Sequence, residues 1–181
     1  MKIGGEMERL MSKTVYDYMD WPEIEAVVYG EETAPRDVMG PRLTPDGVLI
    51  QGFFPEARAA AVVIGRKKYE MELEDEAGYY AVLIPGRRIP DYEFQVEFEK
   101  ETKNFKDAYA FGRLLTEEDE RAFLGGVYYE AYKKMGAHPM VMNGVAGTHF
   151  AVWAPNAVRV SVVGEFNNWD GRALPMHKMP M

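Results

Sequence analysis

The segment from Phe166 to Asp170, FNNWD, gathers side chains that suit a sugar into five consecutive positions. A flat indole beside amide and carboxylate groups matches a neutral, hydroxyl-rich ligand, because the ring covers apolar C–H groups while the amides donate and accept hydrogen bonds. We therefore expect Trp169, Asn167 and Asn168 to form a carbohydrate-binding site. Two alternatives stand beside this one: Trp169 packs on its own domain, as large aromatic residues usually do, and the two amides serve as turn formers.

Two strands and a turn are expected to carry this loop. Residues 147–163 contain an apolar strand pattern, a turn at Pro155 and Asn156, and a second strand at 158–163 that is rich in β-branched residues. Trp153 lies in the middle of the first strand, where burial in the core is the expected outcome. The second strand then leads directly into the candidate loop.

The same plan occurs earlier in the chain. Residues 47–65 align with residues 147–165 at an offset of 100, which is 147 minus 47. The aligned pairs are Gly47 with Gly147, Phe53 with Trp153, Pro55 with Pro155, Ala57 with Ala157, and Val62-Val63 with Val162-Val163. We interpret the repeat as two sandwich modules built on one plan; the alternative is chance similarity between short strands.

Between Asp46 and Phe98, short apolar runs alternate with turn residues, which is typical of an antiparallel sandwich. The expected strands are 48–50, 59–64, 69–73, 79–84 and 92–98. In the last of these, apolar residues alternate with acidic or amide residues, so one face is expected to be buried and the other solvated. The fold class is therefore all-β, with immunoglobulin-like β-sandwich modules joined by short connecting helices.

Helical patterns flank the strands. Residues 6–19 have the spacing of an amphipathic helix, Thr116 caps a helix that starts at Glu117, and 127–135 form another short helix. The predicted parts are a lead-in at 1–22, a first β-sandwich module at 23–115, a helical linker at 116–144 and a partial second module at 145–181. The last part has about three strands' worth of chain, whereas a sandwich needs two sheets over one core, so we expect the second sandwich to be incomplete.

Composition argues against several classes of function. The chain has 181 residues, a formal net charge of −8 and no cysteine. Negative charge disfavours nucleic acid and anionic membranes, and the lack of cysteine removes disulfides and thiolate metal sites. No apolar run approaches the ~18 residues of a membrane-spanning helix, and no signal peptide is recognisable, so a cytoplasmic location is the simplest expectation. With scattered histidines and no glycine-rich phosphate loop, neither a metal nor a cofactor is expected.

Three segments together resemble the N-terminal part of the bacterial-type 1,4-α-glucan (glycogen) branching enzymes. Residues 129–139, YEAYKKMGAHP, are similar to that family's YEKLGAHP linker. Residues 107–111, DAYAF, are similar to its DPYxF segment, with Ala108 in place of the proline. Residues 147–170 resemble the start of the family-48 carbohydrate-binding module. The resemblance extends over residues 25–181.

The resemblance implies partners and a missing active site. In that family a (β/α)8 barrel follows these modules and transfers pieces of an α-1,4 glucan to a 6-hydroxyl, which makes α-1,6 branches. The implied partners are an α-glucan, such as glycogen or amylopectin, and the catalytic barrel in cis, and Trp169 is implied to stack on a glucose ring. Retaining chemistry needs two carboxylates about 5 Å apart. The family's barrel motif DGFRxD has no match here, so no catalytic residue is expected and the chain alone should be inactive.

The resemblance therefore favours the non-catalytic N-terminal part of a 1,4-α-glucan branching enzyme, which serves glucan docking and chain-length selection in glycogen biosynthesis. One alternative is a stand-alone α-glucan-binding or regulatory module. Another is an immunoglobulin-like interaction domain without affinity for sugar. The expected incompleteness of the second sandwich favours the branching-enzyme hypothesis, because a stand-alone binder should end after a finished sandwich.

Overall fold

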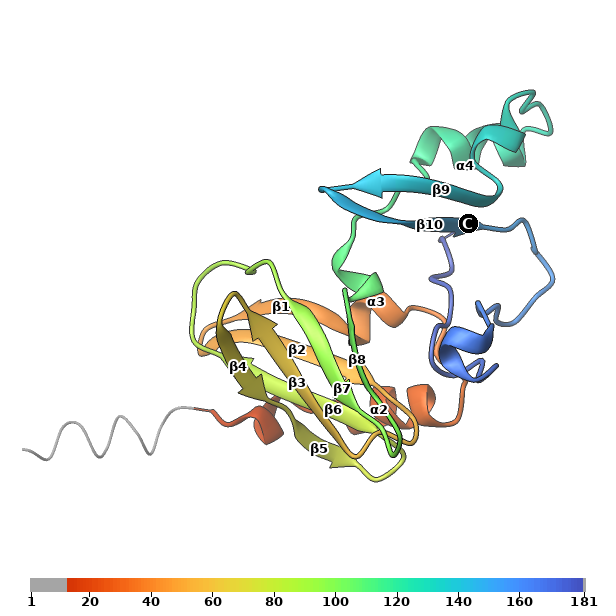
Figure 1. The fold of residues 1–181 in the computed structure, drawn as a ribbon. Coiled ribbons are helices and arrows are strands. Elements are labelled where there is room, and N and C mark those ends of the chain that lie inside the picture. Colours follow the sequence, from red (N-terminus) through yellow and green to blue (C-terminus); the bar gives the residue numbers. More distant parts are fainter. Residues whose placement is uncertain (1–12, 181) are drawn as a thin grey trace, which may run out of the picture.

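Eight strands between Gly40 and Phe105 form two antiparallel four-stranded sheets (Figure 1). The computed structural model describes residues 13–180. One sheet has the strand order β1-β2-β6-β5 and the other the order β4-β3-β7-β8. The strands are β1 (Gly40–Thr44), β2 (Gly47–Phe53), β3 (Ala59–Ile64), β4 (Lys67–Glu70), β5 (Glu72–Asp75), β6 (Tyr79–Ile84), β7 (Glu93–Glu97) and β8 (Thr102–Phe105). The predicted all-β sandwich is confirmed.

Side chains from both sheets meet in the core between them. The buried members are Val48, Ile50, Phe54, Ala60, Val62, Met71, Tyr80, Val82, Ile84, Tyr92, Phe94 and Val96. The ring of Phe54 meets the rings of Phe94 and Phe105 edge-on, with centroids 4.9 and 5.8 Å apart. In β7, Phe94 and Val96 are buried while Glu97 is exposed, so the predicted alternation of this strand is confirmed.

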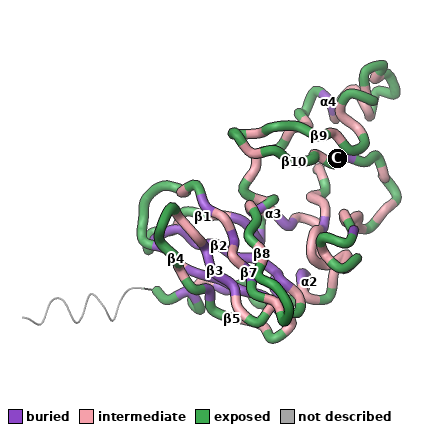
Figure 2. The backbone as a smooth tube through the Cα atoms, in the orientation of Figure 1, coloured by how far each residue is buried: buried purple, intermediate pink, exposed green. Residues whose placement is uncertain are grey.

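A second core lies on the opposite face of the β1-β2-β6-β5 sheet. There η1 (Val15–Tyr18), α2 (Trp21–Val28) and α3 (Pro35–Val38) contribute buried side chains. As a result β2 is buried at all seven of its positions, which Figure 2 shows as a purple stretch in the middle of the module. A strand covered on both faces is expected to be apolar on both, because neither face contacts water, and β2 fits this except at Gln51.

One polar side chain is buried in this second core. Gln51 donates from Nε2 to the carbonyl of Val38 at 2.7 Å and accepts from the hydroxyl of Tyr79 at 2.9 Å. Both ends of the amide are therefore paired, which avoids the cost of an unsatisfied buried polar group. These bonds also connect β2 and β6 with the end of α3.

Helix α2 has a defined start and stop. Asp20 accepts from the backbone N–H of Glu23 at 3.4 Å, and Pro22 occupies the first turn. After Tyr29 the chain passes through Gly30, whose φ of 71° is the left-handed conformation common just past a helix. Neither α2 nor α3 was predicted from the sequence, because helices this short do not complete enough turns to show the helical period.

Four of the five strands predicted for the first module correspond to single strands, namely β2, β3, β6 and β7. The strand predicted at 69–73 is wrong, because the chain changes sheets at Met71, between β4 and β5. Met71 is buried between the sheets and donates its N–H to Ala60 O at 2.9 Å. Strands β1 and β8 were not predicted: Pro41 lies in the edge strand β1, and β8 (TKNF) is mostly polar.

The linker begins with the predicted capped helix, α4 (Glu117–Leu124). Thr116 accepts from the N–H of Asp119 at 3.2 Å, and the Asp119 carboxylate accepts from Thr116 N and Lys134 Nζ, each at 2.8 Å, and from the Tyr128 hydroxyl. Burial favours a higher pKa for Asp119, but these bonds together hold its pKa well below the usual range. Instead of the predicted helix at 127–135, only a 3₁₀ turn, η3 (Ala131–Lys133), is present.

Strands β9 (Gly136–Met142) and β10 (Val145–Ala151) form a separate antiparallel hairpin. Asn143 and Gly144 form the turn between the two strands, and their φ values of 52° and 78° are left-handed. β9 occupies residues that the sequence assigned to the linker, so its pairing joins the linker to the second module. The division of the chain at residue 144 stays a prediction.

The strand predicted at 158–163 is wrong. In the described part of the chain this segment makes one isolated β-bridge, between Ser161 and Pro175. β-branched composition alone does not make a strand, because a strand also needs a neighbour that supplies a hydrogen-bonded ladder and a covered face. The repeat is therefore retained at its turn, where Ala57 N donates to Phe54 O at 3.1 Å and Ala157 N to Ala154 O at 3.0 Å, and is lost after it.

Half of the helix predicted at 6–19, residues 6–12, lies outside the described residues. Its described end forms η1, a single 3₁₀ turn, rather than an α-helix. Among residues 13–180, none of the helices has the length and apolar character needed to cross a lipid bilayer.

Candidate functional site: the FNNWD loop

The FNNWD loop (residues 164–172) is shaped by the side chain of Asn167. Its Oδ1 accepts from the N–H of Gly164 at 3.0 Å, and its Nδ2 donates to the carbonyl of Val162 at 2.9 Å. The backbone closes the same turn, because Trp169 N donates to Gly164 O at 2.9 Å and Asp170 N donates to Asn167 O at 3.0 Å. Both ends of the Asn167 amide are thus engaged inside the loop, which matches its turn-forming alternative.

Trp169 presents its indole to solvent, with 67% of the residue exposed. Trp169 and Asn168 both have left-handed backbones, with φ of 58° and 54°. This conformation costs a non-glycine residue about 1–2 kcal/mol. The hydrogen bonds of the loop therefore maintain a shape that the free chain would avoid. The result is an exposed indole next to the exposed Asn168.

A second exposed aromatic residue, Phe166, lies in the same loop, with 59% of it exposed. Its ring folds back over Gly164, where a Cβ would lie only 2.4 Å from the ring atom Cε1. Only glycine permits this close approach. The loop therefore exposes two aromatic residues three positions apart, and aromatic faces bury the apolar C–H groups of a ligand.

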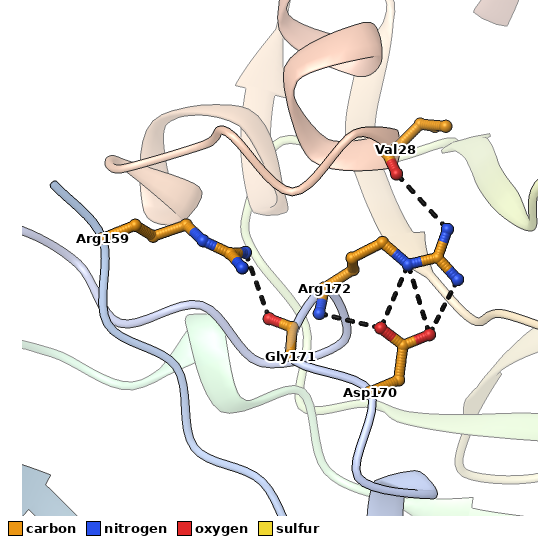
Figure 3. Close-up of polar contacts among 5 residues, drawn as sticks. All are labelled: Val28, Arg159, Asp170, Gly171 and Arg172. Carbon is orange, nitrogen blue, oxygen red and sulfur yellow. Dashed lines mark hydrogen bonds and ion pairs between the residues drawn. The ribbon is translucent and has the colours of Figure 1, made fainter.

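The carboxylate of Asp170 is paired with Arg172 (Figure 3). The guanidinium donates from Nε to Oδ1 at 3.0 Å and from Nη2 to Oδ2 at 2.8 Å, and the backbone N–H of Arg172 also donates to Oδ1 at 2.9 Å. Two parallel bonds of this kind fix geometry as well as adding energy. The bonds from Arg172 lower the pKa of Asp170. Asp170 is therefore committed to the protein rather than available to a ligand.

Contacts between sequence-distant residues dock this region on the first module. The bonds are Arg172 Nη1 to Val28 O at 3.3 Å, Tyr109 Oη to Pro175 O at 2.8 Å, and Lys178 N to Thr33 O at 2.8 Å. Arg172 was not among the site residues predicted from the sequence. The sequence feature that could have identified Arg172 is the order Asp-Gly-Arg directly after Trp169, because it places a carboxylate and a guanidinium on either side of a glycine turn.

A cavity of about 720 Å³ lies beside the hairpin and α4. Its lining includes Phe123, Met140, Phe150, Trp153, Val160 and Met176. Trp153 stacks on Phe123, with centroids 5.2 Å apart and planes 14° from parallel, and remains 45% exposed. The expectation that Trp153 is buried in the core is wrong, because no second strand of this segment covers its other face. Trp169 is not among the residues that line the cavity.

The three histidines are separate from the loop. His138 pairs its Nε2 with Met135 O at 2.8 Å, whereas His149 and His177 line the cavity, where burial lowers the pKa of each. Residues 13–180 contain no group of three His, Asp or Glu side chains placed to hold a metal ion.

Two family models match the chain. Residues 20–109 match the N-terminal domain of the alpha-1,4-glucan branching enzyme GlgB, and residues 134–180 match carbohydrate-binding module 48, the isoamylase N-terminal domain. The catalytic module of the multi-modular glycogen-degrading pneumococcal virulence factor SpuA, solved with an inhibitor, is 18% identical, with a TM-score of 0.32. That match covers 48% of this chain and 14% of the SpuA chain, so this chain spans a small part of its length. From the two family models, the chain carries the N-terminal region of a glycogen branching enzyme, with a carbohydrate-binding module of family 48 after its first domain.

Proposed function

We propose that this chain is a glucan-docking part of a branching enzyme and that its FNNWD loop binds an α-glucan. The observation that carries the proposal is the exposed indole of Trp169, held in a left-handed backbone by hydrogen bonds within the loop. A side chain this large is normally covered in a folded protein. The exposure of the indole on a hydrogen-bonded loop supports a preformed binding surface for a flat ligand.

Each loop residue has a distinct role in this proposal. Trp169 stacks on a glucose ring, and the exposed amide of Asn168 bonds the hydroxyls at the rim of that ring. Asn167 belongs to the same site but acts by shaping the loop, since its own amide bonds Gly164 and Val162. The site therefore combines one stacking face with few polar groups, which suits a repeating neutral polymer.

The cavity beside the hairpin, lined mainly by apolar side chains but also by polar ones such as His149 and Arg159, is the competing location for a ligand. A glucan carries hydroxyls on every ring edge, and the hydroxyls set against the apolar part of the lining, such as Phe123, Phe150 and Met176, would lose their bonds to water without replacement. An exposed aromatic face leaves the same hydroxyls in contact with water. The chemistry of the ligand therefore favours the FNNWD loop over the cavity.

The finer role we propose is chain-length selection for a catalytic barrel in cis. A glucan held at Trp169 has one point fixed relative to the barrel. The distance between Trp169 and the active site of the barrel then determines the length of the piece that is transferred. The expected setting is glycogen biosynthesis in the cytoplasm. The described residues contribute binding only, and the transfer chemistry belongs to the barrel.

Affinity electrophoresis in gels containing glycogen or amylopectin tests the proposal. The chain should be retarded, and Trp169→Ala should migrate as it does in a gel without glucan. Tyr129→Ala is the matched control, because Tyr129 is 90% exposed and lies on the linker rather than in the loop. Equal retardation of the parent chain and of Trp169→Ala would overturn the assignment, as would the absence of any retardation of the parent chain.

A further inference from the structure

Arg172 connects the FNNWD loop with the first module through two sides of its guanidinium (Figure 3). One side carries the paired bonds to Asp170. On the other, Nη1 donates to the carbonyl of Val28 at 3.3 Å, and the guanidinium carbon lies 5.5 Å from the ring centroid of Phe53. Val28 and Arg172 are 144 positions apart in the sequence. A single side chain thus bridges the loop and the helical layer of the first module.

The contact lies at the C-terminal end of α2. Val28 is the last residue of that helix, where carbonyl groups lack partners within the helix and the helix dipole favours a cation. Gly30 follows, and a Cβ at this position would lie 3.2 Å from Arg172 Cγ and 3.3 Å from Arg159 Nη1. Arg159 in turn donates to Gly171 O at 3.2 Å. The missing side chain of Gly30 therefore leaves room for both arginines.

We infer that Arg172 is a positioning residue that fixes the FNNWD loop on α2, so that the first module sets the orientation of Trp169 toward its ligand. The inference rests on the proposed glucan binding. Asp170, the partner of Arg172, follows Trp169 directly in the chain, and the Asp170 carboxylate takes its hydrogen bonds from Arg172. If the loop is released from α2, the indole of Trp169 is no longer held in one orientation. Binding of glucan then weakens, because the site is no longer preorganised.

A pair of glycines in the same conformation provides the test. Gly30 and Gly126 each follow an eight-residue helix, α2 or α4, and both have a φ of 71°. Alanine at either position carries the same left-handed strain. Only Gly30→Ala places a methyl group against Arg172 and Arg159, because a Cβ at Gly126 meets nothing within 4 Å. The difference between the two variants therefore isolates the contact with the arginines.

Two readouts separate the positioning of Trp169 from the binding of glucan. In the 181-residue chain labelled with 5-fluorotryptophan, the ¹⁹F signal of Trp169 is assigned with Trp169→Phe and recorded without any glucan. Gly30→Ala and Arg172→Gln should shift or broaden this signal, whereas Gly126→Ala should leave it unchanged. For maltoheptaose, we expect Kd to rise about five- to tenfold in Gly30→Ala and Arg172→Gln and to stay within about twofold in Gly126→Ala.

Each outcome has a distinct meaning. An unchanged Trp169 signal in a folded Arg172→Gln chain overturns the positioning role, and so does an equal change in Gly126→Ala. If no variant and no parent chain binds maltoheptaose, the proposed function fails, while the ligand-free ¹⁹F signal still decides the positioning role. If Gly30→Ala does not fold, Arg172→Lys replaces it: lysine keeps the charge but loses the two-pronged bond to Asp170, so the same shift of the Trp169 signal is expected.

Discussion

The stability of the first module should depend on the protonation of Asp107. This carboxylate is only 5% exposed; it accepts from the Tyr92 hydroxyl at 2.6 Å and from the N–H of Tyr109 at 2.9 Å. Burial raises the pKa of Asp107 from 3.8 to about 6, although both hydrogen bonds oppose the change. Asp107→Asn keeps the contacts without the charge, because the amide oxygen accepts from Tyr109 N while the amide nitrogen donates to the Tyr92 hydroxyl oxygen.

The sign follows from the direction of the pKa change. The native state holds the Asp107 proton more tightly than the unfolded chain does, so the contribution of Asp107 to stability is fully present below about pH 4 and is lost as the pH rises to about 6. A difference of about two pKa units corresponds to ~3 kcal/mol. Asp107→Asn should therefore match the parent chain near pH 4 and exceed its free energy of unfolding by up to ~3 kcal/mol near pH 7.

Urea unfolding of both chains at several pH values from about 4 to about 7 measures this difference, and subtraction removes the titration of the groups that they share. Asp91→Asn is the control, because the side chain of Asp91 is 91% exposed and pairs with Lys106 on the surface. The reasoning is refuted if the difference between Asp107→Asn and the parent chain is constant over this range. It is equally refuted if the parent chain gains stability relative to the variant as the pH rises.

Two further substitutions, each compared with a control variant, test the backbone of the fold and of the loop. Gly47→Ala should lower the free energy of unfolding by about 3 kcal/mol or more, because Gly47 has a φ of 139° and a Cβ there would lie 2.4 Å from Ile84 O. Gly65→Ala, with a φ of 59° and open space, should cost only about 1 kcal/mol in the same urea experiment, and equal costs would contradict the steric argument. Asn167→Ala should speed amide hydrogen exchange at Gly164 and Trp169 by about five- to 150-fold, the effect of losing about 1–3 kcal/mol of local bonding, whereas Asn168→Ala should leave both rates unchanged.

The first module could be predicted from its sequence because its signals are local. Alternating apolar residues in β7 and turn residues between the strands identify the sandwich. The exchange of sheets at Met71 was not predictable, because residues 67–75 show no break in strand character where the chain crosses. Residues 158–163 were predicted as a strand that the structure does not form. Their composition favours a strand, but a strand also needs a pairing partner, which lies outside the segment itself.

In the candidate site, too, some features follow from the local sequence and others depend on contacts with distant residues. The sequence shows that an indole and two amides are adjacent, which suffices to nominate the FNNWD loop. It does not show that Asn167 bonds inward to Gly164 and Val162, since that depends on a tight turn of particular geometry. Nor does it show Arg172 at the end of α2, because the carbonyl it bonds belongs to Val28, far away in the sequence. Residue types nominate the ligand chemistry, while long-range contacts decide which groups remain available to it.

A titration of the chain with maltoheptaose, followed through the indole N–H signals of its three tryptophans, tests the central claim most directly. Contact between Trp169 and glucan predicts a saturable shift of the Trp169 signal, while Trp21 and Trp153 stay in place. A saturable shift of Trp153 with none at Trp169 would move the ligand to the cavity and contradict the account, and so would the absence of any shift at glucan concentrations that retard the chain in the gel.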